Sequence, residues 1–420
     1  MMNENIKHYF RHLGRRLWAF FRWLSFSLMA GILIGLASAL FHFCMVTANE
    51  TRARYPWLIF FLPAAGLAIV GAYHLLHDEK DTGTNLVLSA IQSGKHIPLK
   101  MAPLIFISTV ATHLFGGSAG REGAALQLGG SLGNTLGRIL KFDEKDQHIM
   151  IMCGMSAAFS TLFGTPLAAA IFSMEVVSVG IMHYAALVPC VVSSLTAKGI
   201  AGSFGIAPEQ FPLANLPEFG IRPAIFITIL AILCAGVSSL FCLTLHTGEK
   251  LNKKYFPNPF TRIFSGGAIL IALTLLAGNQ DYNGAGMPVI ARCFENDFVP
   301  YAFLLKILFT AVTLSAGFKG GEIVPSFFIG ATFGCLFGNA AGFSPPLCTA
   351  AAMGAVFCGV TNCPITSLLI CFELFGFEGM PYYLLAVSIG YMLSGYYGLY
   401  HSQKIVYSKF KTEFINRKAK

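Results

Sequence analysis

The chain has 420 residues, of which 55% are hydrophobic and only 12% are charged. A soluble globular protein carries about 25% charged residues, so this composition excludes a soluble domain with an ordinary water-facing surface. The net charge of +9 does not indicate nucleic-acid binding, because basic residues gather before the first apolar run and after the last one. The eleven cysteines are scattered, mostly inside apolar runs and without a C-x-x-C pair. This pattern favours apolar packing and indicates neither a disulfide framework nor a metal site.

Apolar runs of about 20 residues, the length needed to cross a hydrocarbon core, recur along the chain. Examples in chain order are residues 24–46, 57–76, 183–204 and 224–245. The first run has no small-residue cleavage pattern after it, so we interpret it as a retained span and not as a signal peptide. The chain is therefore predicted to be an all-α polytopic membrane protein.

Basic residues mark both ends of the chain, and the positive-inside rule then predicts that both termini are cytoplasmic. The prediction divides the chain into five parts: a basic cytoplasmic N-terminus (1–22), a first membrane repeat (23–204), a linker on the extracellular side (205–222), a second, inverted membrane repeat (223–402) and a basic cytoplasmic tail (403–420).

The two membrane halves are related by an internal duplication. Residues 104–123 match 304–323, and residues 155–175 match 353–373, with glycines and glutamates in register. The linker lacks the basic character of both termini, so each half is expected to cross an odd number of times and the halves to be inverted. Inverted repeats with broken helices place a site near the midplane, where helix N-termini offer free amides. The duplication therefore predicts transport or channel function for a small anion.

Glu122 is the strongest candidate for a functional residue. It follows glycines at an expected helix start, and an ionisable group inside a span is functional by default. We expect its carboxylate to occupy the anion's own place and to leave it on protonation. A salt bridge with the adjacent Arg121 is the less favoured alternative, because neighbouring residues point different ways on a helix, and Arg121 is expected to pair with another carboxylate. Glu322 repeats this logic in the second half, with an ion pair to Lys319 as the alternative.

Other polar residues in the spans receive structural interpretations. Glu175 and Glu373 are repeat-related acids at helix ends, and we predict structural roles for both. The stretch 116–120 matches the G-x-S-x-G pattern of serine hydrolases, with Ser118 as nucleophile and His113 as base, but it lacks the strand–turn–helix context. Small-residue patterns in membrane helices usually serve close packing, so no enzymatic activity is predicted.

Four motifs resemble the CLC family of chloride channels and proton-coupled anion antiporters. GSAGREGAALQLGGSLG (117–133) resembles the family's glutamate-gate signature, and GGEIVPSFFIGATFG (320–334) resembles its second-half anion-binding motif. TGTNL (82–86) stands where the first-half anion loop belongs, and GLYHS (398–402) resembles the segment that carries the central tyrosine, here Tyr400. The resemblance covers about residues 20–402 and implies an inverted-repeat homodimer with one pathway per subunit.

Departures from the chloride-type pattern resemble the fluoride-exporting branch of this family. Ala124 replaces a proline after the gate motif, and Thr82 and Asn85 replace the serine and proline of the first loop. Val176 stands where chloride antiporters carry an inner proton-transfer glutamate, and Glu322 replaces an apolar residue. The resemblance implies fluoride/proton antiport that exports cytoplasmic fluoride, with Glu322 taking part in proton coupling.

The expected activity is therefore proton-coupled fluoride export across the plasma (inner) membrane. Chloride/proton exchange and passive anion conduction through the same fold remain the alternatives. The expected partners are fluoride or chloride, protons, the lipid bilayer and a second copy of the chain, with no cofactor, metal or nucleic acid. Besides Glu122 and Glu322, the residues expected to bind the anion are Thr82, Gly83, Thr84, Asn85, Gly123, Ala124, Ile323, Val324, Phe327, Phe328, Tyr396 and Tyr400.

Overall fold

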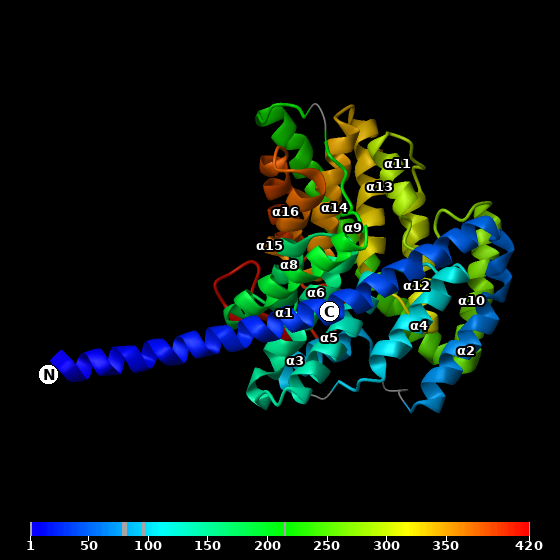
Figure 1. Ribbon diagram of the computed structural model, residues 1–420. Coiled ribbons are helices and arrows are strands. Elements are labelled where there is room, and N and C mark those ends of the chain that lie inside the picture. Colours follow the sequence, from blue (N-terminus) through cyan, green and yellow to red (C-terminus); the bar gives the residue numbers. More distant parts are fainter. Residues whose placement is uncertain (1, 78–81, 95–96, 214–215, 420) are drawn as a thin grey trace.

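The structure is a computed structural model that describes residues 2–77, 82–94, 97–213 and 216–419. Within these ranges the chain forms sixteen α-helices, three 3-10 helices and three short strands (Figure 1). The helices of the first half are α1 (Met2–Arg54), η1 (Pro56–Phe61), α2 (Leu62–Leu75), α3 (Thr84–Ser93), α4 (Met101–Leu114), α5 (Glu122–Ile139), η2 (Glu144–Asp146), α6 (Gln147–Phe163), α7 (Pro166–Glu175), η3 (Tyr184–Ala186) and α8 (Leu187–Ser203). The second half contains α9 (Ile221–Tyr255), α10 (Pro259–Ala277), α11 (Met287–Phe294), α12 (Ala302–Ala316), α13 (Ile323–Ala341), α14 (Pro345–Thr361), α15 (Pro364–Phe375) and α16 (Met380–Leu393).

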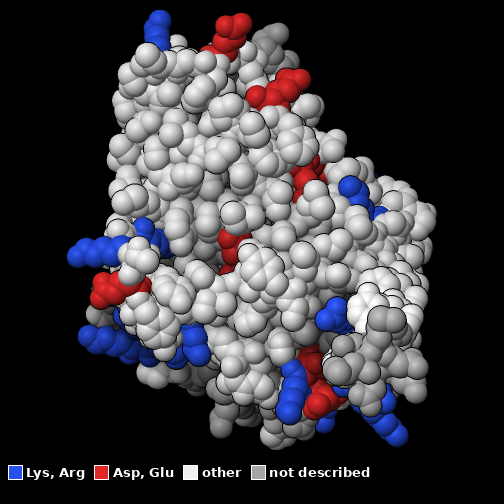
Figure 2. All heavy atoms as spheres, turned by 90° about the vertical axis from the view of Figure 1, so that its left-hand side faces the viewer, with Lys and Arg blue, Asp and Glu red and all other residues white. Residues whose placement is uncertain are grey.

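The helices confirm a polytopic membrane protein. Six helical stretches in the described part of the chain are long and apolar enough to span a membrane, and they include the four runs identified in the sequence. Several other helices are apolar but only 10–17 residues long, as the prediction of short and broken spans requires. Figure 2 shows one face of the molecule, where most visible Lys and Arg side chains lie in the lower half.

The helix order repeats across the two halves. Helices α1 to α8 correspond in sequence to α9 to α16, and α5 packs on α6 as α13 packs on α14. Glycines allow both close crossings: a Cβ atom on Gly133 would lie 3.1 Å from the Cα of Gly154, and one on Gly330 would lie 2.7 Å from the Cα of Met353. Small residues therefore bring these backbones together, which is the role predicted for the glycine-rich motifs.

The two halves close each other's helix ends. The Glu175 carboxylate at the end of α7 accepts hydrogen bonds from the backbone N–H groups of Ile365 and Thr366, in the first turn of α15. The Glu373 carboxylate in α15 accepts the equivalent bonds from Leu167 and Ala168, in the first turn of α7. A carboxylate at a helix N-terminus satisfies free amides and the positive end of the helix dipole. Both glutamates thus have the structural roles predicted for them.

The C-terminal tail folds back as a small sheet that the all-α prediction did not include. Strand β2 (Lys404–Tyr407) pairs in parallel with β1 (Ser178–Val179), which follows α7, and antiparallel with β3 (Phe414–Lys418). Ser178 lies opposite Lys404 in this register. The sheet therefore fixes the segment that precedes it, residues 398–402, against the connection between α7 and α8.

Candidate functional site

The centre of the molecule is a contact between the starts of α5 and α13. The backbone N–H of Gly120 donates to the carbonyl of Gly321 at 2.6 Å, and the N–H of Gly321 donates to the carbonyl of Gly120 at 2.7 Å. Only glycine fits here, since a Cβ atom on Gly123 would lie 2.8 Å from the Cα of Gly321. Two helix N-termini from opposite halves therefore lie against each other, as the duplication predicts, and their first amides have no partner within their own helices.

Glu122 begins α5 and is only 1% exposed. Its carboxylate turns back over the helix start, where Oε2 accepts from the backbone N–H of Arg121 at 2.9 Å and Oε1 accepts from Arg121 Nε at 3.3 Å. The expectation that these neighbours do not pair was wrong, because Arg121 precedes the helix and the Glu122 side chain folds towards it. Arg121 also reaches Glu209 at 3.2 Å, so its predicted pairing with another carboxylate is confirmed.

Glu322 immediately precedes α13 and faces the first turn of α5. Its Oε2 atom would lie 3.6 Å from a Cβ atom on Gly123. The Nζ atom of Lys319, the alternative ion-pair partner, lies 4.1 Å from the ring centre of Tyr73. The two candidate glutamates therefore belong to one site at the junction of the halves.

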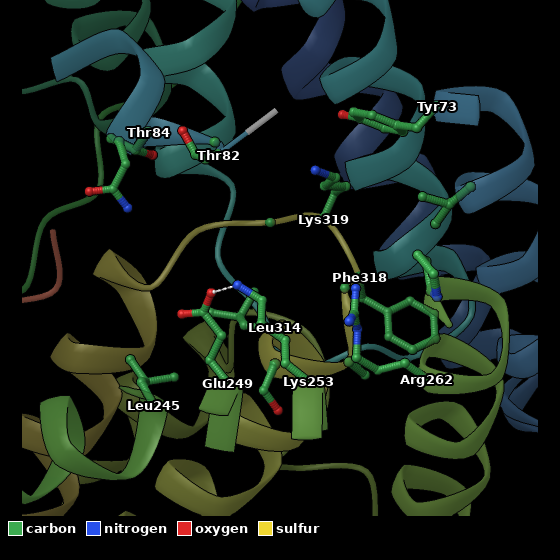
Figure 3. Close-up of a pocket in the computed structure, with 18 of the residues that line it drawn as sticks. Tyr73, Thr82, Thr84, Leu245, Glu249, Lys253, Arg262, Leu314, Phe318 and Lys319 are labelled. Atoms are coloured by element: carbon green, nitrogen blue, oxygen red, sulfur yellow. Dashed lines mark hydrogen bonds and ion pairs between the residues drawn. The ribbon is translucent and has the colours of Figure 1, made fainter. Parts of the chain in front are cut away.

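A cavity of roughly 990 Å³ is lined by residues near the end of α9 and by Glu322. Figure 3 shows Thr82 and Thr84 on one side of this space, with Glu249 and Lys253 joined by an ion pair on another. The polar and charged residues that line the cavity include Tyr73, His74, Thr82, Thr84, Asn85, Ser89, Gln127, His246, Glu249, Lys253, Asn258, Arg262, Ser315, Lys319, Glu322, His401 and Ser402.

The start of α3 contributes a third helix N-terminus. Gly83 has a positive φ of 64°, which glycine adopts readily and which turns the chain into the helix. The hydroxyl oxygen of Thr84 would lie 3.5 Å from a Cβ atom on Gly123, so Thr84 reaches the site, while Thr82 is exposed to the cavity. The Asn85 side chain is instead committed to structure, because its Oδ1 atom accepts from the backbone N–H of Ser402 at 2.9 Å.

The two predicted tyrosines occupy different places. Tyr400 is fully buried, and its hydroxyl has no hydrogen-bond partner among the described residues. Tyr396 is not brought to the site: its hydroxyl is hydrogen-bonded to Ser408 at 2.7 Å, and the Arg417 guanidinium lies 3.6 Å from its ring centre. The tail sheet, which the sequence did not reveal, holds this residue.

The apolar candidates at the helix starts are all buried. Phe327 stacks on Phe357 with ring centres 4.9 Å apart, and Phe328 lies 5.1 Å from the Lys306 ammonium. Ala124 belongs to a hydrophobic cluster with α1 and α6, whereas Ile323 and Val324 belong to the main core. These three side chains are occupied by packing, so backbone amides are what their helix starts can offer an anion.

The serine-hydrolase arrangement is absent from this region. Ser118 Oγ is hydrogen-bonded to the Thr310 hydroxyl at 3.1 Å, and the His113 Nε2 atom lies 3.4 Å from the carbonyl of Gly120. Ser118 thus has a threonine as its side-chain partner and not the proposed base.

Gln127 is a candidate that the sequence analysis missed. It is 2% exposed, lines the cavity one turn beyond Gly123, and its Nε2 atom donates to the Thr84 hydroxyl at 3.4 Å. Its Oε1 atom has no partner among the described residues. The sequence could have identified Gln127, because it is a single glutamine in the otherwise apolar stretch GAALQLGG (123–130) and a buried amide requires hydrogen-bond partners.

The assembled site can bind a small anion and carry protons. Three helix starts supply free amides and positive dipole ends, the Thr84 hydroxyl supplies a further donor, and two carboxylates can exchange protons. Among the described residues no group of three or more His, Cys, Asp or Glu side chains could hold a metal ion.

Comparisons with known proteins agree with this geometry. A family model described as "Voltage gated chloride channel" matches residues 72–395. A chloride/fluoride channel protein of Pseudomonas syringae pv. tomato is 36% identical over 400 residues, which cover 92% of this chain and 87% of that protein. The H(+)/Cl(-) exchange transporter ClcA of Vibrio cholerae serotype O1 is 25% identical over 388 residues, which cover 84% of this chain and 81% of that protein.

Solved structures show the same fold. The crystal structure of a CLC-type fluoride/proton antiporter superimposes with a TM-score of 0.88 at 32% identity, over 91% of this chain and 97% of that chain. A slow cyanobacterial Cl⁻/H⁺ antiporter matches with a TM-score of 0.78 at 19% identity, over 89% and 94% of the two chains. Because the family model matches residues 72–395, which are more than half of this chain, the chain belongs to the CLC (voltage-gated chloride channel) family.

Proposed function

We propose that this protein is a fluoride/proton antiporter that exports fluoride from the cytoplasm, with Glu122 as protonatable gate and Glu322 as second proton-coupling carboxylate. The observation that carries the proposal is the meeting of these two glutamates at the abutting starts of α5 and α13. The names of the Pseudomonas relative and of the fluoride/proton antiporter support fluoride as the anion.

The gate follows from competition for the same amides. The Glu122 carboxylate accepts the Arg121 N–H at the helix start, which is also where an anion would bind. Protonation weakens the hydrogen bond from the Arg121 N–H to the Glu122 carboxyl group, so that fluoride can bind in its place. Arg121 keeps its second carboxylate, Glu209, so the arginine remains neutralised while the gate is open.

Fluoride sets a stricter demand than chloride, because it is smaller and holds its water more strongly. The proposed replacements for that water are the free amides at the starts of α3, α5 and α13, the Thr84 and Tyr400 hydroxyls, and the protonated carboxyl of Glu322. Glu322 lies between the cavity and the first turn of α5. Its carboxyl group can therefore transfer a proton between the cavity and the helix start, and when protonated it can donate a hydrogen bond to an anion that moves between them.

The direction of transport is proposed from the electrical balance. Fluoride leaving the cell moves negative charge outward, and a proton entering the cell moves positive charge inward. A membrane potential that is negative inside therefore drives both movements. We place the protein in the plasma membrane with both termini and the cavity mouth on the cytoplasmic side, in keeping with the basic residues near α9's end and in the tail. The proposal includes a homodimer, as the family resemblance implies.

Proteoliposomes test the proposal. Vesicles loaded with fluoride or chloride are opened to flux with valinomycin, and the anion and proton are followed with ion-selective electrodes and a pH probe. We expect fluoride efflux to exceed chloride efflux and to drive proton uptake. Glu122→Gln should abolish proton-coupled flux, while the exposed linker control Glu218→Gln should not.

The second candidate is chloride/proton exchange, which the Vibrio cholerae relative favours by its name. Equal chloride and fluoride fluxes with intact proton coupling would support that candidate and refute fluoride preference. Fluoride flux without proton movement would instead indicate a channel.

A further inference from the structure

The first helix is too long to be only a membrane span. α1 has 53 residues and so extends for about 80 Å, whereas the hydrocarbon core is about 30 Å thick. Figure 1 shows its first part leaving the body sideways. The point of departure is Arg22, which forms an ion pair with Asp146 at 3.3 Å and lies 4.1 Å from the ring centre of Phe142. Both partners lie in the charged connection between α5 and α6.

The projecting segment, residues 8–22, has two distinct faces when its residues are placed on a helix of 3.6 residues per turn. Apolar residues recur at intervals of three and four: Tyr9, Phe10, Leu13, Leu17, Phe20 and Phe21. The opposite face is basic or titratable: His8, Arg11, His12, Arg15, Arg16 and Arg22. Trp18 lies at the border between the faces, and the segment contains no acidic residue.

The apolar face is uncovered in the structure of the single chain. Tyr9 is 63% exposed, Phe10 64% and Phe21 58%. Large apolar side chains concentrated on one side of a helix mark a surface that binds something. The occupant has to be apolar where these rings lie and negatively charged where the arginines lie. The interfacial region of an anionic bilayer has both properties. Residues 8–22 directly precede the membrane-spanning part of α1, so they begin at this interfacial region.

We propose that residues 8–22 form an interfacial helix that lies on the membrane surface, with its aromatic face in the acyl boundary and its arginines on the phosphates of anionic lipids. Basic amphipathic helices with aromatic residues bind membranes in this way. The inference concerns a lipid surface and does not depend on which anion the protein transports.

Tryptophan fluorescence tests the inference in the full-length protein. The chain has three tryptophans, so Trp23→Phe with Trp57→Phe leaves Trp18 as the only reporter. The protein is placed in nanodiscs of phosphatidylcholine alone or mixed with phosphatidylglycerol. Quenching is measured with lipids brominated near the top of the acyl chain and, separately, with acrylamide in the water.

In the anionic membrane we expect a blue-shifted Trp18 emission, strong quenching by brominated lipid and weak quenching by acrylamide. The triple variant Arg11→Gln, Arg15→Gln, Arg16→Gln should lower the ratio of docked to free helix about 125-fold, since each basic residue near an anionic surface contributes about fivefold. The control Lys404→Gln, Lys411→Gln, Lys418→Gln removes the same charge from the tail and should leave quenching unchanged.

Two results would overturn the inference. Trp18 accessible to acrylamide and insensitive to brominated lipid in the anionic membrane would show a helix in water. Trp18 protected from both quenchers would show a helix packed on a second copy of the chain.

Discussion

Removal of the Glu175 carboxylate should destabilise the protein without uncoupling it. This side chain is 8% exposed and accepts three hydrogen bonds from α15: Ile365 N–H at 3.1 Å, Thr366 N–H at 2.8 Å and the Thr366 hydroxyl at 2.6 Å. A hydrogen bond to a charged group contributes about 1.5–3 kcal/mol, and buried donors left without a partner add to the loss. We therefore expect Glu175→Ala to lower the free energy of unfolding by about 4 kcal/mol.

The repeat provides a matched comparison. Glu373 makes only two such bonds, to Leu167 and Ala168 at 3.1 and 2.9 Å, and it is partly exposed. Water can replace part of what Glu373→Ala removes, so its expected cost is smaller, about 2–3 kcal/mol. The assay is thermal unfolding in detergent, followed by the loss of the monodisperse peak in size-exclusion chromatography. Equal midpoints for the two variants, or a lower midpoint for Glu373→Ala, would refute the reasoning from hydrogen-bond number and burial.

Transport by the same variants, measured after reconstitution into liposomes, separates a structural role from a proton-transfer role. Glu175 lies one residue before Val176, the place of the inner proton-transfer glutamate in chloride antiporters according to the sequence resemblance. Its carboxylate caps α15, so below the unfolding temperature Glu175→Ala should keep the wild-type ratio of protons to anions. A ratio that falls in folded protein would assign Glu175 to the proton path.

Three further changes probe the site and its scaffold. Glu322→Gln should lower the ratio of protons to fluoride in simultaneous electrode recordings, and an unchanged ratio would remove Glu322 from the coupling mechanism. Tyr400→Phe should leave thermal stability unchanged, because the hydroxyl has no partner among the described residues, and should weaken fluoride binding about tenfold in calorimetric titrations. Gly133→Ala should cost about 2 kcal/mol by forcing a methyl group against Gly154. The control Gly199→Ala, with open space around it, should raise stability by up to about 1 kcal/mol, so equal effects of the two would contradict the close crossing.

The sequence predicted the broad architecture because its signals are periodic and repeated. Apolar runs located the long spans, and the matched stretches 104–123 and 304–323 located the two helix starts that meet at the centre. Glu122 and Glu322 could be paired in advance because the duplication relates them. These features depend on local composition and on register, both of which one sequence contains.

Features that depend on side-chain direction or on distant pairing were not predicted. The contact between Arg121 and Glu122 arises because one residue precedes the helix and the other begins it, whereas the prediction treated both as helical. The removal of Tyr396 from the site depends on strand pairing between residues 178–179 and the tail, two segments with no shared sequence pattern. Gln127 was missed because its role appears only when α3 lies beside α5.

The paired glycines between the two halves limit how the molecule can move. Gly120 and Gly321 join the two halves by a pair of reciprocal backbone hydrogen bonds at 2.6 and 2.7 Å. A transport cycle in which one half tilts against the other would have to break both bonds in a place with little water to replace them. These two bonds therefore restrain relative movement of the halves at the starts of α5 and α13. The distance between the Cα atoms of these two glycines should stay constant through the cycle while the glutamates beside them turn.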